Sequence, residues 1–187
     1  MNTTLSSIRP GTISAVLAAF LALGALPQRV AANHLTDAEQ TVERYKKTDP
    51  DLKRFFESSA GYAVFSTVGK GGVGFGGAYG AGVLYEKGKA TGRTSLTQAT
   101  IGLQLGAQTY SEIIFFETEQ ALEEFKSNQF AFSAQLSAVA LQSGASANAK
   151  YREGVAVFTS AKKGLMVETS IGGQRFGYKP FKAEASK

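Results

Sequence analysis

The stretch GVGFGGAYGAGVLY, residues 72–85, decides the fold because it alternates large and minimal side chains. The large residues share one parity: Val73, Phe75, Tyr79, Val83 and Tyr85. Glycines occupy the other parity: Gly74, Gly76, Gly80 and Gly82. Successive side chains of a strand point to opposite faces, so the stretch predicts one long strand with an aromatic face and a nearly bare face. Glycines repeated at one parity indicate close backbone approach or sharp curvature, as where a sheet curls into a barrel.

The first 32 residues have the features of an export signal. Met1 to Arg9 carry only positive side-chain charge, and the apolar stretch from Ile13 to Leu26 is too short and too early for a spanning helix. Val30-Ala31-Ala32 supplies the small residues of a signal-peptidase site, so we expect cleavage after Ala32, with an uncleaved anchor as the alternative. The chain has no cysteine, which excludes disulfides and thiol chemistry. We therefore expect an exported bacterial protein in the periplasm, peripheral to a membrane, with a single domain after the signal.

The net charge of +5 is modest, and its lysines and arginines are scattered or paired along the chain. No basic run of the kind that marks a nucleic-acid-binding arm is present, so we expect no nucleic-acid partner. A mild positive charge is compatible with anionic lipid head groups, although such charges commonly only solvate a surface.

Residues 33–58 are expected to form an amphipathic helical arm. Thr36-Asp37-Ala38-Glu39 has the pattern of a capping box at a helix start, and Asp49-Pro50 can end that helix and begin another. The basic residues of the arm are Arg44, Lys46, Lys47, Lys53 and Arg54. Its candidate apolar contacts are Val42, Tyr45, Phe55 and Phe56. These nine residues are the candidate lipid-binding site.

After the arm, in residues 59–187, the apolar period changes from helical to two. Extended segments are predicted at 61–85, 92–96, 100–109, 112–116, 130–140, 155–160, 165–170 and 175–178. Glu86-Lys87-Gly88-Lys89 is a turn, and Thr118-Glu119-Gln120 opens a short helix. No crossover helix separates successive strands, so the sheet should be mainly antiparallel. The expected fold class is α+β: a curled, barrel-like sheet with the helical arm and one short additional helix.

Few residues of this sequence suit catalysis. Gly72-x-Gly74-x-x-Gly77 fits a dinucleotide-binding pattern, but the alternation continues beyond it, and no helix begins there to face a phosphate. His34 is the only histidine, and the acidic residues at 119, 123 and 124 have the spacing of a solvated helix face. We therefore expect no enzyme activity, no metal and no cofactor.

The chain resembles the SYLF-domain family of lipid-binding domains. The resemblance runs from about Ser59 to Tyr178. It rests on these segments in order: Gly61-Tyr62-Ala63-Val64-Phe65, Gly69 to Gly74, Gly77 to Val83, Gly102 to Gln108, Ile113 to Phe116, Ala121 to Phe125, Val155 to Ser160 and Lys163-Gly164-Leu165. The resemblance implies a curled antiparallel sheet with helices at one side, membrane-lipid binding, and a preceding amphipathic helix that reaches the membrane.

The leading hypothesis is non-enzymatic binding of phospholipids in the bacterial cell envelope through the basic arm and the glycine- and aromatic-rich sheet. In the simpler interpretation, the arm only caps the sheet and buries its aromatic residues. Two other classes stay open. One is an outer-membrane β-barrel, which would also show alternating strands, aromatics and a signal peptide. The other is an envelope module that binds a partner protein through a sheet edge or the arm.

Overall fold

The computed structural model describes residues 26–128, 131–132 and 138–181. Most of the expected signal peptide, residues 1–25, lies outside them. The chain divides into two compact units, Met1–Asn33 and His34–Lys187, and the fold below is that of the second. The helices are α2 (Leu26–Thr48), the 3-10 turn η1 (Pro50–Leu52), α3 (Lys53–Ser58) and α4 (Glu119–Lys126). The strands are β1 (Gly61–Glu86), β2 (Lys89–Phe116), β3 (Ala131–Phe132), β4 (Ala138–Ala140) and β5 (Val155–Pro180).

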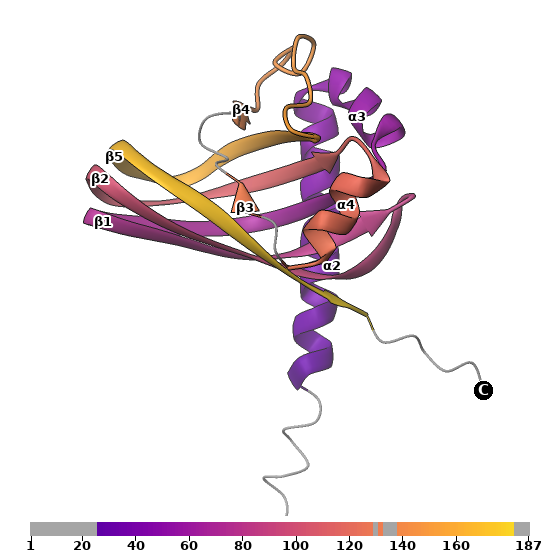
Figure 1. The fold of residues 1–187 in the computed structure, drawn as a ribbon, viewed down its shortest axis with the longest axis horizontal. Helices are drawn as coiled ribbons and strands as arrows, with labels where there is room; N and C mark the ends of the chain where they lie inside the picture. The colour runs from indigo at the N-terminus through magenta and orange to yellow at the C-terminus, as the bar shows by residue number, and fades with distance from the viewer. Residues whose placement is uncertain (1–25, 129–130, 133–137, 182–187) are drawn as a thin grey trace, which may run out of the picture. The chain divides into compact units, whose positions relative to one another are not determined.

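Three very long strands make most of the sheet, and they lie side by side in Figure 1. β1 pairs antiparallel with β2, and β2 pairs antiparallel with β5. β3 pairs antiparallel with β5, while β4 pairs parallel with it. In the described part of the chain the order is β1-β2-β5-β3 with β1 at an edge, so the sheet is curled but open. The α+β class and the curled antiparallel sheet are confirmed, whereas closure into a barrel is not found.

The strand boundaries differ from those expected. Separate segments at 92–96, 100–109 and 112–116 are one continuous strand, β2, and the three segments between 155 and 178 are one strand, β5. The breaks seen in the sequence are bends and bulges inside strands, because glycines interrupt the alternation without ending the hydrogen-bonded ladder. The expected strand at 130–140 is described only at its two ends, as β3 and β4.

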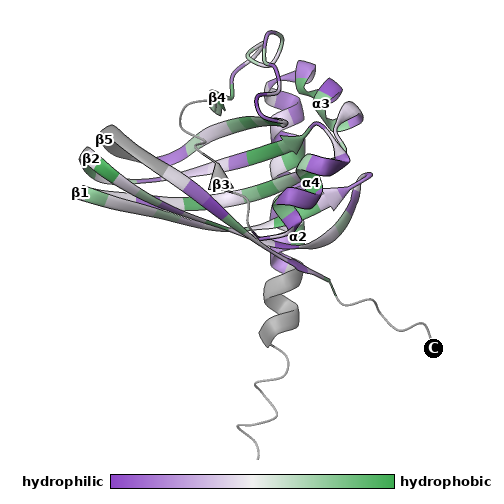
Figure 2. Cartoon of the chain, in the orientation of Figure 1, coloured by the Kyte–Doolittle hydropathy of each residue, from purple (hydrophilic) through white to green (hydrophobic). Residues whose placement is uncertain are grey.

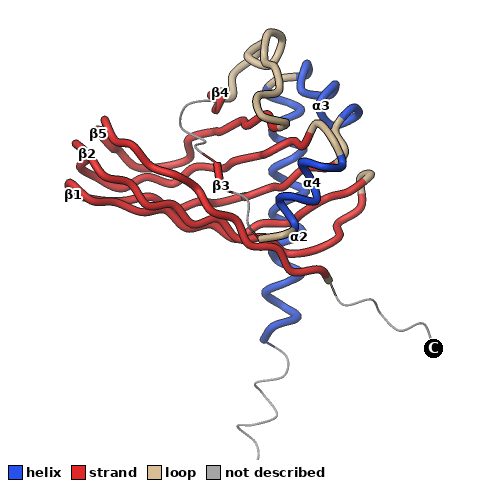
Figure 3. Tube along the Cα trace, viewed as in Figure 1, coloured by secondary structure: helices blue, strands red, loops and turns tan. Residues whose placement is uncertain are grey.

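Each long strand turns back on itself near its middle, at the end of the sheet opposite the helices (Figure 3). In β1 the bend occurs around Gly74, whose φ of 71° suits glycine, and the register shifts between Val73 and Phe75. The two halves of β1 then face one another closely. A Cβ on Gly80 would lie 2.8 Å from Val68 Cγ2, and one on Gly82 would lie 2.5 Å from Val64 O. The bare parity is therefore the inner face of the curl, as the alternation predicts.

The space inside the curl holds the main core. Residues of all three long strands meet there with one side of α4: Phe65, Leu84, Leu96, Ile114, Phe116, Leu122, Phe125, Val157 and Phe176. α4 begins where the sequence predicts, because Thr118 Oγ1 accepts a hydrogen bond from Ala121 N at 3.2 Å. α4 therefore closes the helix end of the curl from one side.

The arm covers the outer face of the same sheet at its helix end. Its buried residues Ala38, Val42, Tyr45, Leu52 and Phe55 pack on Val64, Val83, Tyr85, Ile113, Phe115, Ala156 and Phe158. Tyr45 also donates a hydrogen bond to Ser111 O at 2.8 Å. Asp49 caps η1 as expected, accepting from Asp51 N. The expected helix start at Thr36 is wrong, since α2 begins at Leu26 and the capping-box residues lie within it.

Candidate functional site

An exposed apolar patch lies at the bend of the sheet. It consists of Val73, Phe75, Tyr79, Ile101 and Leu105, whose side chains are 63% to 74% exposed. The register of β1 and β2 places Val73 opposite Leu105 and Phe75 opposite Ile101. Residues opposite each other on neighbouring strands have adjacent side chains on one face, so these side chains form one surface. Figure 2 shows this apolar colour at the bend of β1 and β2.

The patch continues the outer face that the arm covers. Tyr79, Val83 and Tyr85 share one parity of β1; the arm buries Val83 and Tyr85, whereas Tyr79 is exposed. Single exposed apolar residues are ordinary on protein surfaces, but a paired, contiguous group marks a contact surface for another molecule or a membrane. The arm thus covers one half of the outer face, and the other half, at the bend, is exposed to solvent.

The predicted apolar contacts of the arm lie at its interface with the sheet. Val42, Tyr45 and Phe55 are buried there, and Phe56 is half-buried against Phe115 with a ring distance of 4.8 Å. These side chains hold the arm to the sheet, which is the simpler interpretation of the sequence. Their contact with lipid stays a prediction, and it would require the arm to leave the sheet.

The five predicted basic residues of the arm are all exposed, but they are not equivalent. Arg44 donates to Ser111 Oγ at 3.0 Å, and Arg54 donates to Ala149 O at 2.8 Å, so these two also tether the arm. Lys46 and Lys53 form helix-surface ion pairs with Glu43 and Glu57. Exposed pairs of this kind are weak, at about 0.3–0.5 kcal/mol, so both ammonium groups remain available to an anionic surface.

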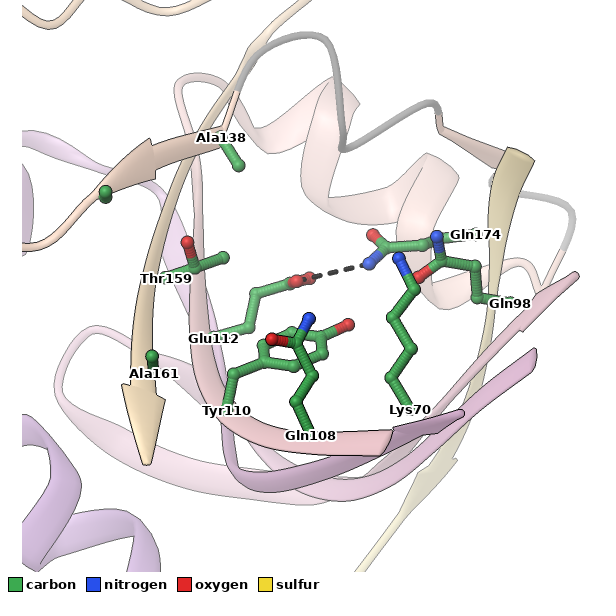
Figure 4. Close-up of a pocket in the computed structure, with 10 residues that line it drawn as sticks. Lys70, Gln98, Gln108, Tyr110, Glu112, Ala138, Thr159, Ala161 and Gln174 are labelled. Carbon is green, nitrogen blue, oxygen red and sulfur yellow. Dashed lines mark hydrogen bonds between the residues drawn. The ribbon is translucent and has the colours of Figure 1, made fainter. Parts of the chain in front are cut away.

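A polar cavity of about 300 Å³ lies inside the curl. Its lining residues come from β1, β2, β4 and β5: Lys70, Gln98, Gln108, Tyr110, Glu112, Ala138, Ala140, Thr159, Ala161 and Gln174. Figure 4 shows Lys70, Gln98, Glu112 and Gln174 directing their polar ends into one space. All four are buried, whereas Ala140 and Ala161 are exposed, so the cavity is polar at its base and reaches solvent beside β4 and β5.

Glu112 is the buried acid of this cavity, with 1% of its surface exposed. Gln174 Nε2 donates to Glu112 Oε2 at 3.1 Å, and Glu112 Oε1 has no hydrogen-bond partner among the residues that the structure describes. Burial raises the pKa of the Glu112 carboxyl to about 7, against the opposing effects of the Gln174 hydrogen bond and the Lys70 charge. The group therefore changes charge near neutral pH.

The titration of Glu112 predicts that the free energy of unfolding falls as pH rises. The folded-state pKa of Glu112 lies above the usual 4.5, so its stabilising effect is full below pH 4.5 and is lost as pH approaches 7. The loss should amount to about 3 kcal/mol. Urea unfolding of wild type and Glu112→Gln at about pH 5 and pH 8 measures it. We expect the variant to lack this loss and exposed Glu117→Gln to retain it; parallel curves for wild type and Glu112→Gln would contradict the assignment.

Two kinds of feature are absent from the described residues. No helix within residues 26–128 or the shorter described segments is long and apolar enough to cross a membrane. No group of three or more histidine, aspartate or glutamate side chains there could hold a metal ion.

Comparison with known proteins gives a family resemblance and one distant relative. Residues 97–179 match the family model Ysc84, described as "Las17-binding protein actin regulator". The match covers less than half of the chain, and it makes the chain similar to the SYLF-domain family. A curated protein, Beta cell expansion factor A of Aeromonas veronii, is 28% identical over 150 residues, which are 79% of this chain and 56% of that protein. This chain therefore spans about half the length of that relative. The family is one of binding domains, linked to lipids and to protein interaction.

Sequence reasoning missed both the exposed apolar patch and the interior cavity. The patch has the same alternating pattern as the covered half of the outer face, and only the length of the arm decides which half is covered. The cavity residues are far apart in sequence, from Lys70 to Gln174. A usable signal was present in Gln98, Gln104, Gln108 and Glu112, which put polar side chains on the inner parity of β2.

Proposed function

We propose that this protein is an exported, non-enzymatic phospholipid-binding protein of the bacterial cell envelope, which sits at the periphery of a membrane. The observation that supports this most is the exposed apolar patch at the bend of the sheet. The family resemblance supports a binding role, and the export signal expected at residues 1–32 supports the location.

The patch offers enough apolar surface for membrane contact. Burying one side chain of this size fully is worth about 1.5–3 kcal/mol, so five that are about two-thirds exposed provide roughly 5 kcal/mol or more on transfer from water. Tyr79 adds a phenol that suits the boundary between acyl chains and head groups. The bend lies at the end of the sheet opposite α3 and α4 (Figure 1), so these helices do not stand between the patch and a bilayer.

The arm contributes charge in this proposal. With the arm packed on the sheet, Lys46, Lys47 and Lys53 remain exposed, and each cation near an anionic membrane surface is worth about 1 kcal/mol. Val42, Tyr45, Phe55 and Phe56 keep the arm in place. Binding should therefore combine an apolar term from the patch with a salt-sensitive term from the arm.

Co-sedimentation with vesicles tests both terms. Wild type should pellet with vesicles containing phosphatidylglycerol and less with purely zwitterionic vesicles. Changing Lys46, Lys47 and Lys53 to glutamine should weaken binding to anionic vesicles about tenfold or more and leave zwitterionic binding unchanged. Arg44 and Arg54 are kept because they tether the arm.

The matched control removes three other exposed cations, Lys89, Lys150 and Lys179, by the same substitution. It should bind nearly as wild type does. Equal weakening by both triple variants would show that only net charge matters, and recovery of wild type in the supernatant with both vesicle types would overturn the proposed function.

A second candidate is a protein-binding module of the envelope. The family description names a protein partner for its members, and the patch could bury itself on a partner chain instead of a membrane. Cross-linking in cells from a position beside the patch separates the two, since a protein partner would give a discrete cross-linked species that lipid contact would not.

A further inference from the structure

Several buried polar atoms that line the interior cavity have no hydrogen-bond partner among the described residues. Gln98 Nε2, Gln98 Oε1, Gln174 Oε1 and Glu112 Oε1 are buried and have no hydrogen-bond partner within the described protein. Each such atom costs about 1–3 kcal/mol when it is left unpaired. Four of them on three residues lining one space indicate a binding site.

These side chains are held by the long strands and not by loops. Gln98 and Glu112 lie on β2 and Gln174 on β5, and the register pairs Gln98 directly with Gln174. The two amides are therefore neighbours on the inner face, with Glu112 hydrogen-bonded to Gln174 beside them. Such a site is rigid, and its polar atoms are placed before any ligand arrives.

The chemistry of the lining selects the ligand class. A carboxamide presents an acceptor and a donor, and its orientation can be reversed to exchange them. A phosphate would use only the donors of such amides, and an ammonium group only the acceptors. Hydroxyl groups both donate and accept, so they satisfy either orientation and bring no new charge into the buried base.

The volume agrees with a small molecule. At about 30 Å³ per water, the cavity of about 300 Å³ corresponds to roughly ten water molecules. That is the scale of one sugar ring or of a short polyol. Ala140 and Ala161 are exposed, so a dissolved compound would enter the cavity beside them.

We propose that the cavity between Lys70, Gln98, Glu112 and Gln174 binds a polyhydroxyl group, carried either by a free sugar or polyol or by the head group of a lipid. Gln98 and Gln174 exchange paired hydrogen bonds with neighbouring hydroxyls, and Glu112 accepts from another. Lys70 keeps the base of the site electrostatically balanced against Glu112. This site is separate from the apolar patch, and it extends the proposed membrane function to recognition of a soluble or head-group polyol.

Titration of the isotope-labelled protein with glucose, myo-inositol and glycerol, followed by NMR, tests the proposal. We expect saturable shifts in the side-chain amide signals of Gln98 and Gln174 with at least one of these compounds. Inorganic phosphate and ethanolamine serve as charged comparison probes and should shift them less. No saturable response to any polyol, or a stronger response to phosphate or ethanolamine, would overturn the proposal.

Two variants test whether the polyol that shifts the NMR signals binds in the cavity. Gln98→Leu removes two unpartnered atoms, so it should fold stably and bind the responding polyol about tenfold more weakly. Ala161→Phe keeps the polar base but obstructs the opening, and it should also weaken binding; exposed Asn148→Thr is the unaffected control. Unchanged affinity in both cavity variants would overturn the assignment.

Binding to vesicles distinguishes the two possible sources of the hydroxyl groups, a lipid head group and a free polyol. If the source is a lipid, Gln98→Leu should weaken binding to phosphatidylglycerol vesicles but not to equally charged phosphatidylserine vesicles. If the source is a free polyol, both vesicle affinities should be unchanged while binding of the dissolved compound is about tenfold weaker. Variants of the apolar patch should retain binding of the dissolved polyol, so failure of the membrane proposal and failure of this one are distinguishable.

Discussion

Replacing both Phe75 and Ile101 by threonine is expected to lower the affinity for phospholipid vesicles about 100-fold. The two residues are opposite each other on β1 and β2 and form the centre of the apolar patch. Removing their apolar surface should cost about 3 kcal/mol of transfer free energy. Threonine favours strands, so the folded sheet should persist.

Stability and binding must be measured together for this double variant. Urea unfolding should place it within about 1 kcal/mol of wild type, because both side chains are exposed. Asn148→Thr, at an exposed position on the loop between β4 and β5, should bind vesicles as wild type does. If the folded double variant binds vesicles with wild-type affinity, the patch is not a membrane-binding surface, and the arm alone would have to provide the binding.

The second large effect concerns the fold itself. Gly82→Val should abolish folding or reduce the free energy of unfolding by more than about 3 kcal/mol. A Cβ at this position would lie 2.5 Å from Val64 O and 2.8 Å from Phe65 Cδ1. Backbone atoms of the facing half of β1 cannot move aside without opening the curl. The steric clash therefore cannot be relieved by a small local shift.

The matched control is Gly69→Val, on the same strand. A Cβ there would meet nothing within 4 Å, and Gly69 is exposed. Valine should be tolerated at that position or even stabilise the strand slightly, since it has the higher strand propensity. Circular dichroism and thermal unfolding compare the two variants. Equal tolerance of valine at both positions would contradict the close packing of the two halves of β1.

Much of the fold could be predicted from local patterns. The alternation at 72–85 identified the long strand and its curvature, because side-chain size at each parity directly sets how closely two backbones approach. Asp49 and Thr118 marked helix starts correctly, since a cap depends on only a few neighbouring residues. Strand number was overestimated, because a bent strand and two strands joined by a turn both show interrupted alternation.

The functional surfaces were harder to predict because they depend on tertiary packing. Val83 and Phe75 have the same parity and similar apolar character, yet the arm buries the first and leaves the second exposed. The apolar residues of the arm suggested membrane contact in the sequence, and the structure places them against the sheet. Glu112 lies between Ser111 and Ile113 on β2, and only the folding of the strands brings it to Gln174 and Lys70.

A tryptophan placed in the patch tests the central claim most directly, because the chain contains none of its own. The emission of Phe75→Trp should shift to shorter wavelength when phosphatidylglycerol vesicles are added, and acyl chains carrying bromine should quench it. Asn148→Trp, on the exposed loop, should show neither change. If the Phe75→Trp emission stays that of a water-exposed indole while the protein sediments with the vesicles, the apolar patch is not the membrane-binding surface.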